Sequence, residues 1–212
     1  MPARLAGLCF NLAMKILVFA GSTRQNSFNR RLARQAAQMA TAAGAEAMLL
    51  ELGDLDIPMY NADLEARGTP LDVLCLKQLL WEHPAWIICS PEYNGSYTAL
   101  LKNTIDWASS PVAGHATWND GTLPFRGKVV GMLSASNGRL GGLRSQSHLA
   151  PLLMNLGCWV APQAFALHGA ASAVDPTSGA LVEPAHHTGV RAVVEQVLWA
   201  AKRLHGDEAA HP

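Results

Sequence analysis

Short apolar runs alternate with amphipathic segments along most of the chain, and this alternation predicts the fold class. Five apolar runs have the length of buried strands, at residues 15–20, 46–52, 85–90, 128–135 and 158–167. Segments with helical spacing of apolar positions lie at residues 28–43, 71–82, 98–109, 142–156 and 187–204. Because parallel strands need crossover connections, usually helices, this order predicts one doubly wound α/β domain, with a five-stranded parallel sheet and helices on both faces.

The composition fits one compact domain and argues against two classes of partner. Of the 212 residues, 50% are hydrophobic and 15% are charged, which provides enough apolar material for a substantial core. The 16 basic and 16 acidic residues cancel. A neutral chain of this kind is not expected to bind nucleic acid or a membrane surface as its main partner.

The cysteines and histidines show no pattern of a metal site or a disulfide framework. Cys9, Cys75, Cys89 and Cys158 are widely spaced and form no CxxC pair, and we expect reduced core thiols of a cytoplasmic protein. The 8 histidines are scattered without the spacing of metal ligands. No metal site is therefore expected.

The two ends of the chain are expected to lie outside the domain. The opening apolar run is interrupted by Asn11 and Lys15 and lacks a small-residue cleavage site, so a signal peptide is not expected. We expect residues 1–13 to be an N-terminal extension, with Met14 as an alternative start. The domain then spans residues 14–205, and residues 206–212 form a tail.

Charge is distributed unevenly near the amino end. Residues 1–45 contain six Lys or Arg and no acid, whereas residues 46–72 contain seven acids and one base. This asymmetry indicates an anion site near the start of the chain. For Arg30, Arg31 and Arg34, a solvated basic helix face is an equally valid interpretation.

Three loops follow the first, third and fourth predicted strands and contain the unusual residues. Ligands of doubly wound sheets bind at the carboxyl ends of the strands, beside the topological switch point. The loops at those positions are residues 21–28, 91–97 and 134–142. We therefore expect the binding site to be built from them.

The first loop, in the stretch GSTRQNSFNRRLA, is suited to a phosphate. It precedes a helix, whose first backbone N–H groups and dipole favour an anion. Hydrogen-bond donors and a charged fork are offered by Ser22, Thr23, Ser27, Asn29 and Arg24. The alternative is that Ser27 or Asn29 only caps the helix, which leaves the other three residues unexplained.

Other phosphate loops are excluded by residues that this loop lacks. It has no GxxxxGK[ST] motif for a nucleoside triphosphate and no GxGxxG motif for a dinucleotide. It has no thiol nucleophile, because no cysteine lies between Cys9 and Cys75. A monophosphate that is bound without reacting remains.

The second loop, in the stretch PEYNGSYTALLKNTIDWAS, is suited to a planar ring. Tyr93 can lie against an aromatic system, while Asn94 and the backbone N–H groups of residues 92–95 can bind the edge of a heterocycle. The alternative is an ordinary turn marked by Pro91 and Gly95.

These two stretches, with GRLGGLRSQ after the fourth strand, strongly resemble the NADPH-dependent FMN reductase family over residues 14–205. The resemblance implies a flavodoxin-like sheet with strand order 2-1-3-4-5 and the cofactors FMN and NADPH or NADH. It also implies hydride transfer from the nicotinamide to the flavin and on to a small-molecule acceptor. Acceptors in the family include quinones, azo compounds, metal oxyanions and free flavin.

The resemblance further implies which residues bind FMN. It implies no catalytic residue in the narrow sense, because the flavin carries the chemistry. The residues that match the family's phosphate positions are Ser22, Thr23, Arg24, Ser27, Phe28 and Asn29. Those that match the segments on the two sides of the isoalloxazine ring are Pro91, Glu92, Tyr93 and Asn94, and Ser134, Ala135 and Ser136. Gly141 and Gly142 match the family's Gly-Gly segment, where the backbone approaches closely.

Members of the family are usually homodimers or homotetramers. The apolar helix at residues 100–107 is a candidate for the subunit contact, and packing in the core of its own chain is the alternative. The chain departs from the family pattern at Thr98, Ala99, Thr104 and the long loop 111–127 with Trp118. These departures bear on the second substrate and the dimer partner more than on FMN binding.

A second function stays open on the sequence alone. A flavodoxin-type electron carrier, or an FMN-binding regulatory protein, would bind FMN without turning over a nicotinamide. Such carriers tend to be strongly acidic, whereas this chain has a net charge of zero. The neutral charge favours the enzyme.

Overall fold

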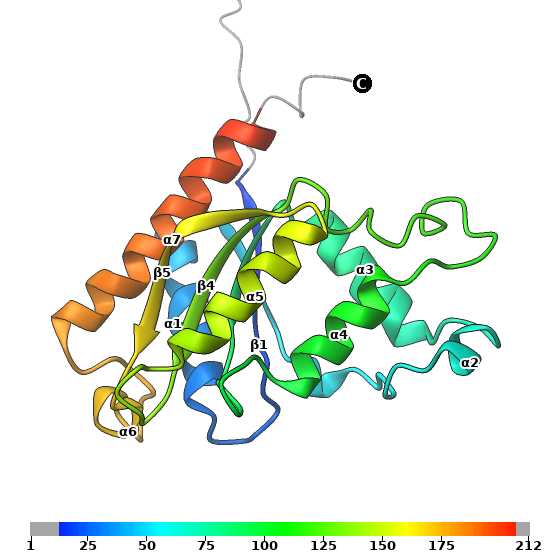
Figure 1. Ribbon diagram of the computed structural model, residues 1–212. Coiled ribbons are helices and arrows are strands. Elements are labelled where there is room, and N and C mark those ends of the chain that lie inside the picture. Colours follow the sequence, from blue (N-terminus) through cyan, green and yellow to red (C-terminus); the bar gives the residue numbers. More distant parts are fainter. Residues whose placement is uncertain (1–12, 207–212) are drawn as a thin grey trace, which may run out of the picture.

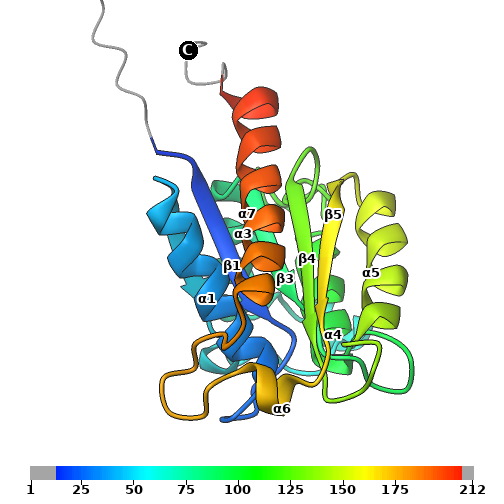
Figure 2. The ribbon, with the colours of Figure 1, turned by 90° about the vertical axis from the view of Figure 1, so that its left-hand side faces the viewer.

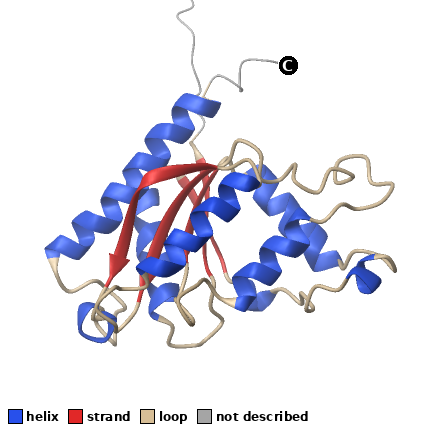
Figure 3. Ribbon diagram, in the orientation of Figure 1, coloured by secondary structure: helices blue, strands red, loops and turns tan. Residues whose placement is uncertain are grey.

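The structure is built on a five-stranded parallel sheet with the strand order β2-β1-β3-β4-β5 (Figure 1; Figure 3). The computed structural model describes residues 13–206, so the extension and the tail expected at the two ends lie almost wholly outside the described residues. The strands are β1 (Lys15–Ala20), β2 (Glu46–Leu50), β3 (Ala85–Cys89), β4 (Val129–Ala135) and β5 (Trp159–Leu167). Every neighbouring pair is parallel, which confirms the predicted sheet and its order.

Long helices connect the strands and follow the last one. In the described part of the chain they are α1 (Phe28–Ala42), α3 (Leu71–Glu82), α4 (Ala99–Ser109), α5 (Leu143–Asn155) and α7 (Pro184–His205). The hydrophobic pattern did not predict the short elements η1 (Leu52–Asp54), α2 (Ala62–Glu65) and α6 (Ala170–Ala173). Helix α7 begins earlier than predicted, because Pro184 is well suited to the first turn of a helix.

The helices cover the two faces of the sheet in separate layers (Figure 2). Helices α1 and α7 pack on one face, whereas α3, α4 and α5 pack on the other. Successive residues of β1 alternate between these layers, with Ile16 and Val18 on the first face and Leu17 and Phe19 on the second. All four side chains are at most 3% exposed, as expected for a central strand covered on both sides.

Helix α4 packs within its own chain. Leu101, Ile105 and Trp107 are buried in it, so these side chains pack in the core of their own chain. The long loop 111–127 after α4 lies at the amino ends of the strands (Figure 1). Within one chain it is therefore at the opposite edge of the sheet from loops 21–28, 91–97 and 134–142. Trp118 anchors it, because its buried ring packs edge-on against Trp81 with the ring centroids 6.1 Å apart.

The prediction of core thiols is correct for two cysteines and wrong for a third. Cys89 and Cys158 are buried, but Cys75 is exposed. The buried face of α3 is set by Val73, Leu76 and Leu80, and this helical phase turns position 75 outward. Cys9 lies outside the described residues.

The first turn of α1 is fixed to the end of β4 by the side chain of Asn29. Asn29 is 3% exposed. Its Nδ2 donates to the Ala135 carbonyl at 2.9 Å, and its Oδ1 accepts from the Ala135 N–H at 2.9 Å. Ala135 is the last residue of β4. The amide of Asn29 thus satisfies both backbone groups there and places the loop before α1 beside the loop after β4.

We predict that Asn29→Ala lowers the free energy of unfolding by about 2 to 4 kcal/mol, because the buried N–H and carbonyl of Ala135 lose their partners. Urea unfolding of the apoprotein measures this change. The matched control is Asn26→Ala in the same loop, whose side chain is exposed and makes no hydrogen bond in the described part of the chain. Equal unfolding midpoints for the two variants would contradict the role given to Asn29.

A buried lysine stabilises the end of α4. Lys77 on α3 is 0% exposed, and its Nζ donates to the carbonyls of Ala108 and Ser110 at 2.8 and 2.6 Å. These carbonyls lie at the C-terminal end of α4, where intrahelical donors are missing and a cation is favoured. Burial lowers the pKa of Lys77 to about 8, and the charge of Glu65 opposes only part of this effect.

We predict a pH-dependent contribution of Lys77 to stability. Its pKa of about 8 in the folded protein lies below the ordinary value of 10.5. Between these values the unfolded chain binds more protons, so raising the pH favours the folded state. The stability difference between wild type and Lys77→Met should therefore grow by about 1 to 3 kcal/mol in favour of wild type between pH 8 and 10.5. Urea unfolding across this range tests it, and a constant difference would refute it.

Candidate functional site

The loop between β1 and α1, residues 21–28, combines buried and exposed polar residues. Ser22 and Ser27 are 8% and 2% exposed, whereas Thr23 and Arg24 are exposed. Ser27 is the N-cap of α1, and its Oγ accepts from the Arg30 N–H at 3.4 Å. The capping alternative is therefore confirmed for Ser27. It is wrong for Asn29, whose side chain bonds to Ala135 instead.

The same loop presents a set of backbone donors without acceptors in the described part of the chain. The set comprises the N–H groups of Ser22, Thr23, Gln25, Asn26, Phe28 and Asn29. They lie at the N-terminus of the 15-residue helix α1, whose dipole adds partial positive charge. Such a group of donors is a binding site for an anion.

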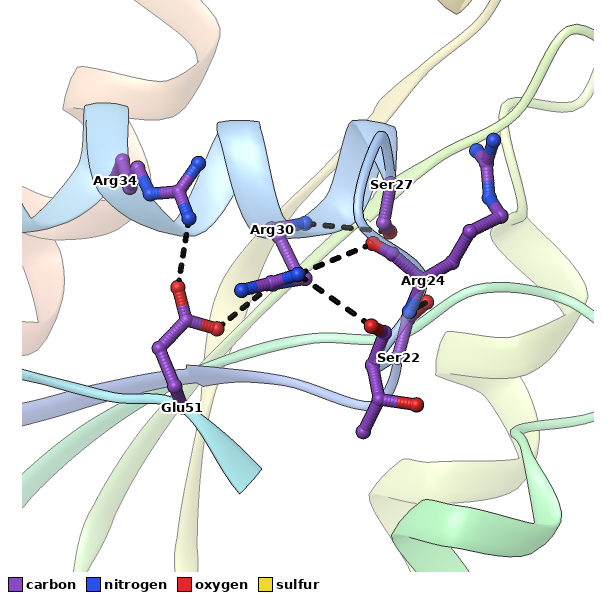
Figure 4. Close-up of polar contacts among 7 residues, drawn as sticks. Ser22, Arg24, Ser27, Arg30, Arg34 and Glu51 are labelled. Atoms are coloured by element: carbon purple, nitrogen blue, oxygen red, sulfur yellow. Dashed lines mark hydrogen bonds and ion pairs between the residues drawn. The ribbon is translucent and has the colours of Figure 1, made fainter. Parts of the chain in front are cut away.

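Arg24 adds a positive charge to this loop. Among the described residues it forms no ion pair, and its guanidinium lies 5.7 Å from the centroid of the Phe28 ring. Its side chain extends away from the contact between Arg30 and Glu51 (Figure 4). The charge of Arg24 is therefore available to a ligand.

Arg30 and Arg34 have a different role from Arg24. Both pair with Glu51, through Arg30 Nε at 2.8 Å and Arg34 Nη2 at 2.8 Å (Figure 4). Partial burial acts to raise the pKa of Glu51, but the hydrogen bonds and charges of the two arginines outweigh it and keep this pKa below its ordinary value. Arg30 is thus largely buried rather than part of a solvated basic helix face, whereas Arg34 stays exposed on the helix surface with Glu51 as its partner.

The loop between β3 and α4, residues 91–97, contains a tight two-residue turn. Tyr93 and Ser96 pair through hydrogen bonds of 2.9 and 3.1 Å. Asn94 and Gly95 between them both have positive φ, at 53° and 82°, as a type I′ turn requires. Tyr93 stands beside the turn and is 56% exposed. The turn predicted as the alternative is present, and it leaves the Tyr93 ring open to a ligand.

The loop between β4 and α5, residues 134–142, lies close to buried backbone. Gly142 has φ +92°, and a Cβ there would lie 2.9 Å from Ser134 Cβ. This geometry fits the close backbone approach expected at Gly142. Any other residue at this position would be strained, because its Cβ would clash with Ser134 and its backbone would need a positive φ. Ser134 is buried, and its Oγ accepts from Gln146 Nε2 at 2.7 Å.

Side chains connect these three loops to one another. Thr98 Oγ1 caps α4 and donates to the Gly21 carbonyl at 2.7 Å, which joins the first loop to the second. Arg144 Nε donates to Glu92 Oε1 at 2.6 Å, which joins the second to the third. Asn29 and Ala135 join the third to the first. The loops therefore form one hydrogen-bonded unit.

The sequence analysis did not predict the loop contacts of Thr98, Arg144, Gln146 and Arg30. Thr98 carried a usable signal, since a threonine directly before a helix is a common N-cap. Arg144 and Gln146 contact residues far away in the sequence, at Glu92 and Ser134. No local pattern marks such partners.

The site contains no activated thiol among its described residues. Cys89, the last residue of β3, lies next to the second loop. Burial raises the pKa of its thiol far above the ordinary value, so the thiol stays protonated at neutral pH. The Glu92 carboxylate is held by Arg144. The site is thus equipped to bind and orient a ligand.

Comparisons with known proteins identify the family of this chain. Residues 14–172 match the model of the NADPH-dependent FMN reductase family. The chain is 38% identical over 144 residues to an NAD(P)H-dependent FMN reductase of Pseudomonas aeruginosa, covering 68% of this chain and 71% of that protein. It is 32% identical over 172 residues to a quinone reductase of Escherichia coli K12, covering 80% and 86%.

Solved structures agree with the sequence comparison. FerB, a flavoenzyme NAD(P)H:(acceptor) oxidoreductase of Paracoccus denitrificans, has a TM-score of 0.74 and 28% identity over 90% of this chain and 98% of its own. A flavodoxin variant of Pseudomonas aeruginosa has a TM-score of 0.52 and 16% identity over 89% of this chain and 99% of its own, and shares the fold alone. The chain therefore belongs to the NADPH-dependent FMN reductase family of oxidoreductases and has a flavodoxin-like fold.

Proposed function

We propose that this chain holds FMN in the three connected loops and uses NADPH or NADH to reduce a small-molecule acceptor such as a quinone. The observation that carries the proposal is the set of N–H groups at the start of α1 that lack acceptors within residues 13–206, together with the charge of Arg24, which has no ion-pair partner there. This donor set fits a phosphate monoester dianion. The phosphate positions are those expected from the sequence: Ser22, Thr23, Arg24, Ser27, Phe28 and Asn29.

The residues of the phosphate loop have different tasks in this proposal. Arg24 contacts the phosphate by charge, and Ser27 holds the first turn of α1 in place. Asn29 contributes its backbone N–H, because its side-chain amide is committed to Ala135. The side chain of Asn29 therefore positions the loop.

The other two loops are proposed to contact the isoalloxazine ring. The segment Pro91 to Asn94 lies along one side, where the exposed Tyr93 ring offers a flat surface and the turn offers N–H groups. The segment Ser134 to Ser136 lies on the other. When bound, FMN supplies hydride acceptance from a nicotinamide and reduction of the acceptor. The protein supplies binding, orientation and a rigid ring site fixed by Arg144 and Glu92.

The proposed class of acceptor, a quinone, is based on the names of related proteins. The E. coli relative and one from Pseudomonas putida are named quinone reductases. Azo compounds, metal oxyanions and free flavin remain further candidates. The alternative, an FMN-binding electron carrier or regulatory protein, finds support only in the flavodoxin-like fold, which carriers and reductases share.

Assembly and location are also part of the proposal. We propose a homodimer or homotetramer, as the family resemblance implies, and a cytoplasmic location. Within the described residues, Cys75, Cys89 and Cys158 form no disulfide with one another, which supports a reducing compartment. Within the described residues, no helix combines the length and apolarity that a membrane span would need.

The first prediction from this proposal is flavin-dependent turnover. The purified holoprotein should be yellow and should be bleached by NADPH or NADH under anaerobic conditions. Added benzoquinone should restore the colour and sustain NAD(P)H oxidation at a rate at least about tenfold above that of free FMN. Absorbance at the flavin bands and at the NAD(P)H band measures both. A holoprotein that neither nicotinamide bleaches would favour the electron-carrier alternative.

The second prediction concerns Arg24. Arg24→Ala should raise the dissociation constant of FMN about tenfold, because it removes a charged contact to the phosphate. Titration of apoprotein with FMN, followed by flavin fluorescence, measures the constant. Arg31→Ala is the control, since it removes an equal charge from the first turn of α1. An unchanged dissociation constant in Arg24→Ala would reject its assignment to the phosphate.

A further inference from the structure

One guanidinium ties the phosphate loop to the second strand. Arg30 Nη1 donates to the carbonyls of Thr23 and Arg24 at 3.4 and 3.3 Å, and Arg30 Nε donates to Glu51 Oε2 at 2.8 Å (Figure 4). Glu51 directly follows β2, so the loop after β1 is anchored to the neighbouring strand. The Arg30 side chain is 19% exposed, and the Glu51 side chain is 23% exposed.

These contacts matter because of what an anion site must avoid. Every peptide unit of a loop carries a carbonyl oxygen as well as an N–H group, and the oxygen repels a phosphate. A loop that binds an anion therefore has to present its N–H groups while its carbonyls are occupied elsewhere. Thr23 and Arg24 lie in the middle of the proposed phosphate loop, and Arg30 donates to both of their carbonyls. The Arg24 carbonyl also accepts from the Ser27 N–H at 3.0 Å, so the Thr23 carbonyl depends on Arg30 more strongly.

The charge of Arg30 is already compensated. Glu51 receives Arg30 on one carboxylate oxygen and Arg34 on the other, at 2.8 Å each. Arg24, by contrast, forms no ion pair among the described residues and extends away from Glu51 (Figure 4). The three arginines thus divide into one that faces a ligand and two that hold the carboxylate, and of these two only Arg30 reaches the loop.

We propose that Arg30, held by Glu51, is a positioning residue for the FMN phosphate. It fixes the carbonyls of Thr23 and Arg24 on the side of Glu51, which leaves the N–H groups of the loop for the phosphate. This inference rests on the proposed function, since it assumes that the phosphate binds in this loop. It concerns a residue outside the positions that the family resemblance assigned.

The test compares FMN with riboflavin, which has the same ring and ribityl chain but no phosphate. Arg30→Ala should raise the dissociation constant of FMN about tenfold and leave that of riboflavin unchanged within about twofold. Fluorescence titration of the apoprotein measures both constants. A thermal melt of each apoprotein reports whether the variant is folded. A general loss of loop structure would weaken both flavins alike, and that result would overturn the proposal.

The matched control is Arg34→Ala. Arg34 lies one turn further along α1 and pairs with the same carboxylate, but it contacts no carbonyl of the loop. Its removal should leave the affinities for both flavins within about twofold of wild type. If Arg34→Ala weakens FMN as much as Arg30→Ala does, lost charge alone explains the effect and the proposal fails.

Glu51→Ala separates positioning from direct contact. If Arg30 acts by holding the loop, loss of its anchor should weaken FMN several-fold and spare riboflavin. If Arg30 itself binds the phosphate, loss of the competing carboxylate should instead tighten FMN, which would overturn the proposal. If Arg30→Ala does not fold, Glu51→Ala still tests the positioning role, because it removes the anchor of Arg30.

The outcomes distinguish the inference from the function on which it rests. A wild-type protein that binds FMN and riboflavin equally well has no phosphate site in this loop, and both proposals then fail. A wild-type protein that prefers FMN, with the preference lost in Arg24→Ala but kept in Arg30→Ala, overturns the positioning role alone. If Arg24→Ala and Arg30→Ala both lose the preference for FMN over riboflavin, the result supports both the proposed function and the positioning role of Arg30.

Discussion

The carboxyl edge of a parallel sheet leaves backbone groups without strand partners, and the whole site depends on how these groups are satisfied. In this chain, side chains from neighbouring loops take over the pairing. Asn29 satisfies both backbone groups of Ala135, and Thr98 satisfies the carbonyl of Gly21. Because each bond joins two different loops, satisfying the backbone also fixes the loops relative to one another.

The N-terminus of α1 is the exception that makes binding feasible. Its backbone N–H groups remain unpaired in the described chain, although the neighbouring carbonyls of Thr23 and Arg24 are bonded by Arg30. This asymmetry between donors and acceptors gives the loop a net attraction for anions. Hydrogen bonds that occupy these two carbonyls and spare the nearby N–H groups therefore define the ligand as much as any side chain that touches it.

The fold was predictable from the sequence because local patterns determine it. The continuous apolar run of β1 indicated a strand covered on both faces, and Ile16 and Leu17 do lie in opposite cores. The grouping of the three loops followed from topology alone. Short elements such as α2 were missed, because four residues carry no measurable period.

Individual contacts within the site were less predictable, since they join residues far apart in the sequence. The excess of basic residues before position 45 and of acids after it was visible, yet the pattern did not show that Arg30 and Arg34 meet Glu51. Asn29 was placed in the right loop, but the partner of its side chain, 106 residues away, was not foreseeable. The residue types in the sequence thus located the site, and the tertiary structure showed which contacts each of these residues makes.

Three ionisable groups of the site are held by burial or by ion pairs, and this bears on how the site would operate. The Cys89 thiol stays protonated, Glu92 is paired with Arg144, and Glu51 is paired with two arginines that keep its pKa low. The buried Cys89 thiol is therefore not placed to exchange a proton during a reaction at neutral pH. A protein built in this way contributes fixed hydrogen bonds and fixed charges to its ligands.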